Sequence, residues 1–144
     1  MKKILFSVGS LQIGGAETVM VDIINNIYKD FDITVLLIEK RGSLIESLNS
    51  NIKVKYLTKS SEYCDNKLSA YLNMIKLSLI YRFLSKKKWY VNRIYKKVLK
   101  DTYDTEIAFL AGVPSDIISR SKKKKSKKIS WIHSCVDKYS YQKY

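Results

Sequence analysis

The segment KILFSVGSLQIGGAETVMVDIINNIY, residues 3–28, decides the fold class. Its first six residues are mostly apolar and stop at Gly9, which is typical of a strand that is buried on both faces. After Gly14 and Gly15, apolar residues recur at helical spacing as far as Tyr28, so a helix is expected to begin at the glycine pair. A buried strand, a short loop and an amphipathic helix make the first unit of an α/β domain.

The rest of the chain repeats this alternation. We predict strands at residues 32–38, 52–57, 104–110 and 128–132, with short helices at 43–48 and 113–121. Residues 66–100 are expected to be helical with a break near 85–88, and Ser115 or Asp116 is expected near the cap of the helix that Pro114 opens. This order predicts a doubly wound parallel sheet, Rossmann-like, in a single domain over residues 1–144.

In a sheet of this kind, ligands bind beyond the carboxyl ends of the strands, near the point where the strand order reverses. The first strand would bring residues 9–15 to that edge, the fourth would bring Gly112, and the fifth would bring His133. We therefore expect three separate loops to converge on one binding crevice.

The loop at residues 9–17, GSLQIGGAE, suits a phosphorylated ligand. Adjacent glycines at a helix N-terminus let the backbone approach an anion such as a diphosphate closely. The pattern is neither GxGxxG nor a phosphate-binding P-loop, since no Lys-Ser/Thr pair follows it. The alternative is a tight turn in which the glycines are needed only for a positive φ.

The net charge of +14 comes from two strips, residues 85–100 and 120–128, each with seven basic residues and no acidic one. A solvated surface, an anionic membrane and a nucleic acid are the three possible explanations. The first strip also holds Trp89, Tyr90 and Tyr95, as an interfacial helix would, and no nucleic-acid-binding motif accompanies the charge, so no nucleic-acid partner is expected. The predicted membrane-contact residues are Lys86, Lys87, Lys88, Trp89, Arg93, Lys96 and Lys97.

The lengths of the apolar stretches and the numbers of histidines and cysteines limit the expected location and cofactors. No apolar stretch is long enough to span a bilayer, so we expect a cytoplasmic protein, peripheral on the inner face of the cell membrane. One histidine and two distant cysteines cannot complete a tetrahedral zinc site, and no metal is expected.

Two motifs together resemble a known family. GGAE opens the first helix, and AFLAGVPSDIISRSKKKKSKKISWIHSCV, residues 108–136, gives a strand, a small loop with proline, a short helix and a basic-flanked strand that ends in WIH. This arrangement resembles the N-terminal domain of the family 4-like retaining bacterial glycosyltransferases of the two-domain GT-B fold, which build capsule, lipopolysaccharide and exopolysaccharide. The resemblance covers essentially the whole chain.

The resemblance implies roles for particular residues. Gly14 and Gly15 would face the donor diphosphate and the acceptor, and Glu17 would anchor their loop. His133 would lie near the transferred sugar as the catalytic residue, where an imidazole can donate or accept a hydrogen bond. The co-substrate would be a nucleotide-sugar, the acceptor would be lipid-linked or a saccharide, and no cofactor would be needed.

The chain departs from the family because it has no C-terminal segment with the paired-glutamate motif that holds the nucleotide. We therefore expect an incomplete acceptor-side half, inactive alone, whose C-terminal domain is a separate chain or is missing. Two alternatives stay open: a non-catalytic basic module that recruits a partner to the membrane, and a dinucleotide-binding domain with Glu39 at the end of the second strand.

Overall fold

Within residues 1–60, 64, 66–84, 88–121 and 125–133, which the computed structural model describes, five strands form one parallel sheet. The strands are β1 (Lys2–Val8), β2 (Phe31–Lys40), β3 (Lys53–Lys59), β4 (Thr105–Ala108) and β5 (Lys127–Ser130). Their order is β3-β2-β1-β4-β5, so the chain builds outward from β1 to one edge and then returns to build the other. The predicted doubly wound α/β fold is confirmed, and the strand order reverses between β1 and β4.

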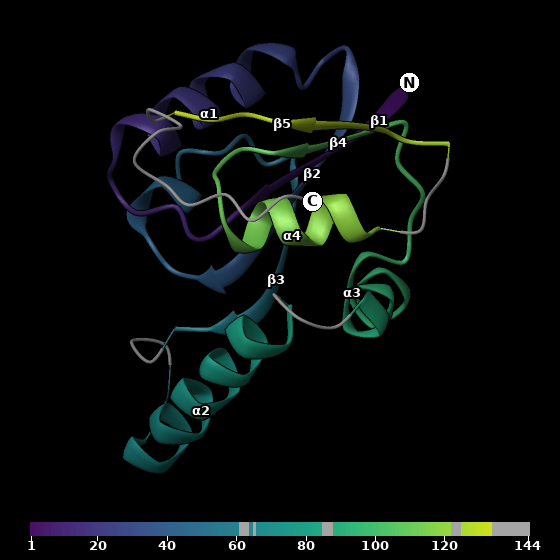
Figure 1. Ribbon diagram of the computed structural model, residues 1–144. Helices are drawn as coiled ribbons and strands as arrows, with labels where there is room; N and C mark the ends of the chain where they lie inside the picture. The colour runs from purple at the N-terminus through teal and green to yellow at the C-terminus, as the bar shows by residue number, and fades with distance from the viewer. Residues whose placement is uncertain (61–63, 65, 85–87, 122–124, 134–144) are drawn as a thin grey trace.

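Helices cover both faces of the sheet (Figure 1). Helix α1 (Gly15–Ile27) lies on one face, and α2 (Lys67–Leu84), α3 (Lys88–Ile94) and α4 (Val113–Arg120) lie on the other. A 3-10 turn, η1 (Ser43–Ile45), follows β2, and a π-helical turn, η3 (Tyr95–Leu99), continues α3. The predicted break near residues 85–88 is confirmed, since α2 ends at Leu84 and α3 begins at Lys88.

Strand β1 joins the two layers because its alternate side chains enter separate cores. Leu5 is fully buried among residues of α2, α3, η3 and α4, whereas Phe6 packs with Met20 and Ile24 of α1. Burying one side chain of this size contributes about 1.5–3 kcal/mol. The apolar run that predicted a strand buried on both faces therefore has the expected surroundings.

The predicted cap of α4 is wrong. The helix begins at Val113 and its N-cap is Gly112, whose φ of 89° strongly favours glycine and which makes no side-chain cap hydrogen bond. Ser115 and Asp116 consequently lie inside the first turn. The Ser115 hydroxyl donates to the Leu110 carbonyl at 3.1 Å, and Asp116 pairs with Arg120 at 3.5 Å.

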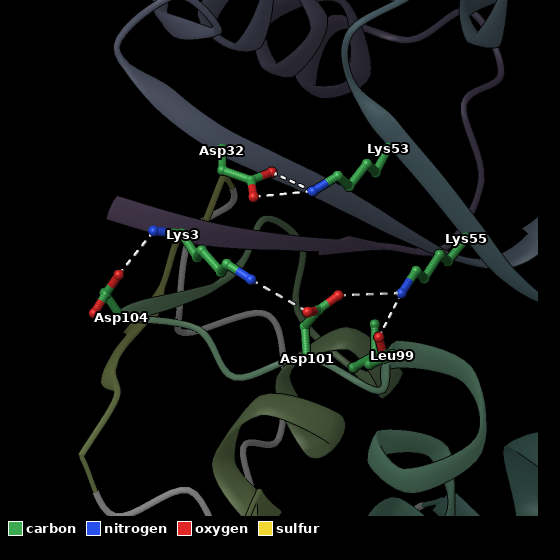
Figure 2. Close-up of polar contacts among 7 residues, drawn as sticks. All are labelled: Lys3, Asp32, Lys53, Lys55, Leu99, Asp101 and Asp104. Atoms are coloured by element: carbon green, nitrogen blue, oxygen red, sulfur yellow. Dashed lines mark hydrogen bonds and ion pairs between the residues drawn. The ribbon is translucent and has the colours of Figure 1, made fainter. Parts of the chain in front are cut away.

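Charged side chains pair at the amino-terminal edge of the sheet (Figure 2). The Lys53 ammonium donates to both oxygens of Asp32, at 2.8 and 2.9 Å, and this hydrogen bond raises the pKa of Lys53. Asp101 lies 3.2 Å from the Lys3 ammonium and 3.6 Å from that of Lys55, and its hydrogen bond to Lys3 lowers the pKa of Asp101. Each of these three lysines has an aspartate beside it, and none lies in the two basic strips.

A buried polar contact fixes η3 against the sheet. The Tyr95 hydroxyl donates to Glu106 Oε2 at 2.8 Å, and the Ser121 hydroxyl donates to Glu106 Oε1 at 3.4 Å. Glu106 is fully buried in β4, and burial, followed by the nearby Glu106, raises the pKa of Tyr95. Tyr95 therefore stays protonated as a donor, and the interfacial position predicted for it is wrong.

Replacing Tyr95 tests the strength of this contact. Tyr95→Phe keeps the ring but leaves a buried Glu106 oxygen without its donor, so we expect the free energy of unfolding to fall by about 1–3 kcal/mol. Urea denaturation followed by circular dichroism measures the change. The matched variant Tyr71→Phe alters an exposed ring and should change the free energy by less than about 0.5 kcal/mol. Equal effects of the two variants would contradict the proposed role of the contact.

Candidate functional site

The carboxyl ends of β1, β4 and β5 lie in register at one edge of the sheet. Ser7 pairs with Ala108, and Ala108 pairs with Ser130. Backbone hydrogen bonds continue beyond the strand ends, since Phe109 N donates to the Ser7 carbonyl at 3.0 Å and Trp131 N donates to the Ala108 carbonyl at 2.8 Å. The segments that follow these three strands, residues 9–14, 109–112 and 131–133, therefore emerge side by side, as the sequence predicted.

An aromatic cluster holds His133 at this edge. The His133 ring lies 4.6 Å from the ring of Phe109, centroid to centroid, and is parallel to the ring of Trp131 at 5.8 Å. Phe109 is fully buried and also contacts Trp131, at 4.9 Å, and Phe6, at 6.4 Å. His133 and Trp131 themselves are exposed, so the cluster offers a supported imidazole and indole to solvent.

Gly14 and Gly15 do not have the positive φ values of a strained turn. Positive φ values among the glycines occur only at Gly42 and Gly112 in the part of the chain that the structure describes. Gly14 is extended, with φ −161° and ψ 156°, and a Cβ on Gly15 would meet nothing within 4 Å. The alternative that both glycines are needed for a positive φ is therefore wrong, and the backbone does not require glycine at position 15.

Glu17 lies against the start of α1. Its carboxylate covers Gly14 so closely that a Cβ on that glycine would overlap Glu17 Oε2. Thr18 adds a second contact, because its hydroxyl donates to the Gly14 carbonyl at 2.8 Å. The role of Glu17 in anchoring the loop stays a prediction, and its position leaves Gly15 exposed at the first turn of the helix.

Gly42 is a positioning residue that the sequence analysis missed. Leu11 N donates to the Arg41 carbonyl at 2.9 Å, and Leu44 N donates to the Leu11 carbonyl at 3.1 Å, so the glycine-rich loop is held against the turn that follows β2. Gly42 has a φ of 106°, and a Cβ there would overlap the Leu11 carbonyl group and the Gln12 nitrogen. A single glycine behind a strand was a weak signal, because the contact joins loops about 30 residues apart.

Gly112 lies on the α4 side of the same edge. It is exposed and borders a hollow of about 330 Å³ between α4 and β5. The hollow has a mostly apolar wall with three serine hydroxyls and one ammonium group near it. Its lining residues are Ala108, Gly112, Ser115, Ile118, Ser119, Lys128, Ile129, Ser130 and Ile132. Gly112 and the segment that ends in His133 therefore border a common space.

The predicted membrane-contact residues belong to a different part of the molecule, on α3 and η3. Trp89, Arg93, Lys96 and Lys97 are exposed there. Lys88 begins α3. Lys86 and Lys87 fall outside the described residues. Arg93 and Lys97 line a hollow that shares no residue with the one beside Gly112.

Two solved structures are similar to this fold. Both are of Phytolacca americana UGT2. The first, complexed with UDP-2fluoro-glucose and pterostilbene, has 12% sequence identity and a TM-score of 0.50, and the match covers 91% of this chain and 30% of that chain. The second, the apo form, has 13% identity and a TM-score of 0.51, with 94% and 30% covered. No family model matches this chain, and no curated protein matches it.

This likeness shows a glycosyltransferase-like α/β fold. The chain spans about 30% of the length of the two similar structures, so it corresponds to a part of them. Within the described residues, no helix is both long enough and apolar enough to cross a membrane.

Gly42→Ala tests the link between the glycine-rich loop and the turn after β2. The added methyl group would collide with the Leu11 backbone at a φ that disfavours any other residue, so we expect the free energy of unfolding to fall by about 2–4 kcal/mol. Gly9→Ala is the control, because its Cβ would meet nothing within 4 Å, and it should shift the free energy by less than about 1 kcal/mol. Urea denaturation compares the two, and an unchanged Gly42→Ala variant would show that the loop adjusts freely.

Proposed function

We propose that this chain is the N-terminal, acceptor-side domain of a nucleotide-sugar-dependent glycosyltransferase. The observation that carries the proposal is the convergence of the uncapped start of α1, the Gly112 turn and the His133 cluster at the edge where the strand order reverses. The glycosyltransferase-like fold supports it. Doubly wound sheets bind their ligands at this edge.

The start of α1 suits the diphosphate of a nucleotide-sugar. Gly14 makes no side-chain cap hydrogen bond, and the N–H groups of the first turn carry the positive end of the helix dipole. The Glu17 carboxylate covers Gly14, so the open approach for a phosphate is at Gly15, which has no side chain and is exposed. In this proposal the leaving diphosphate is stabilised by these N–H groups, and no metal ion or other cofactor takes part.

His133 suits the sugar that is transferred. Strands β1 and β5 are separated by β4 alone, so their carboxyl ends are about 10 Å apart, which leaves room for a sugar and its diphosphate between the helix start and the imidazole. The imidazole can hydrogen-bond a sugar hydroxyl and hold the ring while the bond to the diphosphate breaks and the bond to the acceptor oxygen forms. Phe109 and Trp131 would fix the orientation of the imidazole.

The finer assignment rests on the GGAE and WIH motifs. We propose a retaining, family 4-like transferase of bacterial cell-surface polysaccharide or glycolipid synthesis, which acts on a lipid-linked or saccharide acceptor. A second, C-terminal domain would hold the nucleotide and complete the site. In this proposal the enzyme works in the cytoplasm, on the inner face of the cell membrane.

Gly15→Val tests the proposed diphosphate site. In the Trp89→Phe background, Trp131 is the remaining tryptophan, so its fluorescence reports on the carboxyl edge. This chain would contact the diphosphate and the sugar while the second domain holds the nucleotide, so we expect weak binding, seen as quenching on titration with at least one of UDP-glucose, UDP-N-acetylglucosamine and GDP-mannose. Gly15→Val should weaken this binding at least about tenfold, because a side chain at the helix start keeps the phosphate from the N–H groups.

The stability of the folded chain provides the control. A side chain at position 15 has open space around it, so Gly15→Val should leave the free energy of unfolding within about 1 kcal/mol of the original. Unchanged nucleotide-sugar binding in a folded Gly15→Val variant would contradict the proposed site. Tighter binding of NAD than of any nucleotide-sugar would favour the dinucleotide-binding alternative.

The purified chain should release no sugar from a labelled nucleotide-sugar, because the groups that hold the nucleotide belong to the second domain. Adding that domain should produce transfer to the acceptor, and His133→Ala should reduce the transfer rate at least about a hundredfold, as expected for a residue that contacts the reacting sugar. Release by the chain alone that His133→Ala abolishes would contradict the need for a second domain.

A further inference from the structure

The outward face of α2 carries a second apolar stripe. Ile80 and Leu77 pack inward against the core, yet five large side chains on the opposite face are between 41% and 68% exposed. They follow helical spacing, at positions i, i+3, i+4, i+7 and i+11, and therefore form one continuous line. These residues are Leu68, Tyr71, Leu72, Ile75 and Leu79. In Figure 1, α2 projects from the body of the domain, in agreement with the exposure of these side chains.

Basic side chains lie where α2 meets α3 and η3. Lys76 of α2, Arg93 of α3 and Lys97 of η3 line one hollow of about 120 Å³, whose floor is formed by apolar residues such as Ile80 and Ile94. None of the three cations makes an ion pair within the residues that the structure describes. Three cations around an apolar hollow are suited to a phosphate group with a hydrocarbon attached.

The positive charge of residues 66–100 favours an anionic partner. Residues 66–100 contain ten basic residues and no acidic one. A second copy of this chain is a poor partner for the stripe. Two α2 helices packed through their stripes would bring Lys76 and Arg82 of one copy close to the same cations of the other, and the like charges would repel. An apolar helix face in a segment with this excess of cations instead matches the interface of a bilayer with anionic headgroups.

We propose that the outward face of α2, together with the basic residues of α3 and η3, binds anionic phospholipid bilayers. The stripe enters the boundary between headgroups and acyl chains, while the hollow between Lys76, Arg93 and Lys97 receives a lipid phosphate. Trp89, which is 56% exposed at the start of α3, lies at the same interface. This surface shares no residue with the His133 cluster or the hollow beside Gly112, so the inference does not depend on the proposed sugar transfer.

Co-sedimentation with vesicles tests the inference. The full chain is expected to bind vesicles of phosphatidylcholine with 30% phosphatidylglycerol and to bind pure phosphatidylcholine vesicles at least about tenfold more weakly. Leu72→Gln with Ile75→Gln should weaken binding about tenfold or more, because both side chains lose the apolar contact. Lys76→Gln with Arg93→Gln should weaken it about thirtyfold, as expected for two cations near an anionic leaflet.

Matched variants on other surfaces separate this face from a general effect of charge or apolarity. Lys2→Gln with Lys29→Gln removes the same charge from exposed positions on β1 and after α1, and Val19→Gln removes an exposed apolar side chain from α1. Each should change binding less than about threefold. Circular dichroism of all variants checks that they fold, and the exposed positions make misfolding unexpected.

Three outcomes would overturn the inference. The first is equal binding to neutral and anionic vesicles, or no binding to either. The second is equal weakening by the control variants, which would indicate non-specific attraction of a basic protein. The third is a lipid-free dimer in light scattering that dissociates in the Leu72→Gln, Ile75→Gln variant, which would make the stripe an interface between copies of the chain.

Discussion

The burial of β1 on both faces is the constraint on which the rest of the structure depends. Leu5 faces the core that α2, α3, η3 and α4 share, and Phe6 faces the core of α1, so neither helical layer can pack without this strand. Because β1 is also the strand from which the order runs outward in both directions, its carboxyl end lies at the reversal point. The same packing that stabilises the domain therefore places the glycine-rich loop where ligands of such sheets bind.

Glycines have two different functions at this edge. Gly42 and Gly112 have positive φ values, and the backbone needs glycine there to hold the loop and to begin α4. Gly14 and Gly15 lack that requirement, and position 15 has open space for a side chain. The fold therefore does not explain a glycine at position 15, and in the proposed function the glycine lets a diphosphate approach the helix start.

Helix α2 has a separate physical role. Its inward face closes the core beside β3, α3 and α4, while its outward face leaves five large apolar side chains in solvent. Exposed apolar patches of this kind are typical of interaction surfaces, and in our inference a bilayer covers the stripe. Because the carboxyl edge and this helix involve different elements, attachment and ligand binding can be altered independently by substitution.

The sequence alone determined the alternation of strands and helices along the chain, and this alternation predicted the parallel sheet. It also predicted that residues 9–15, Gly112 and His133, which follow three of the strands, would share one edge of that sheet. These features depend on local periodicity, which can be read from the sequence, and on the general right-handedness of the connections between parallel strands. The tertiary structure decided the rest. The contact of Gly42 with Leu11, the burial of Tyr95 against Glu106 and the exposure of one face of α2 each depend on which distant segment packs alongside. No periodicity within a segment encodes that choice, since α2 is apolar on both sides and only its neighbours determine which side faces water.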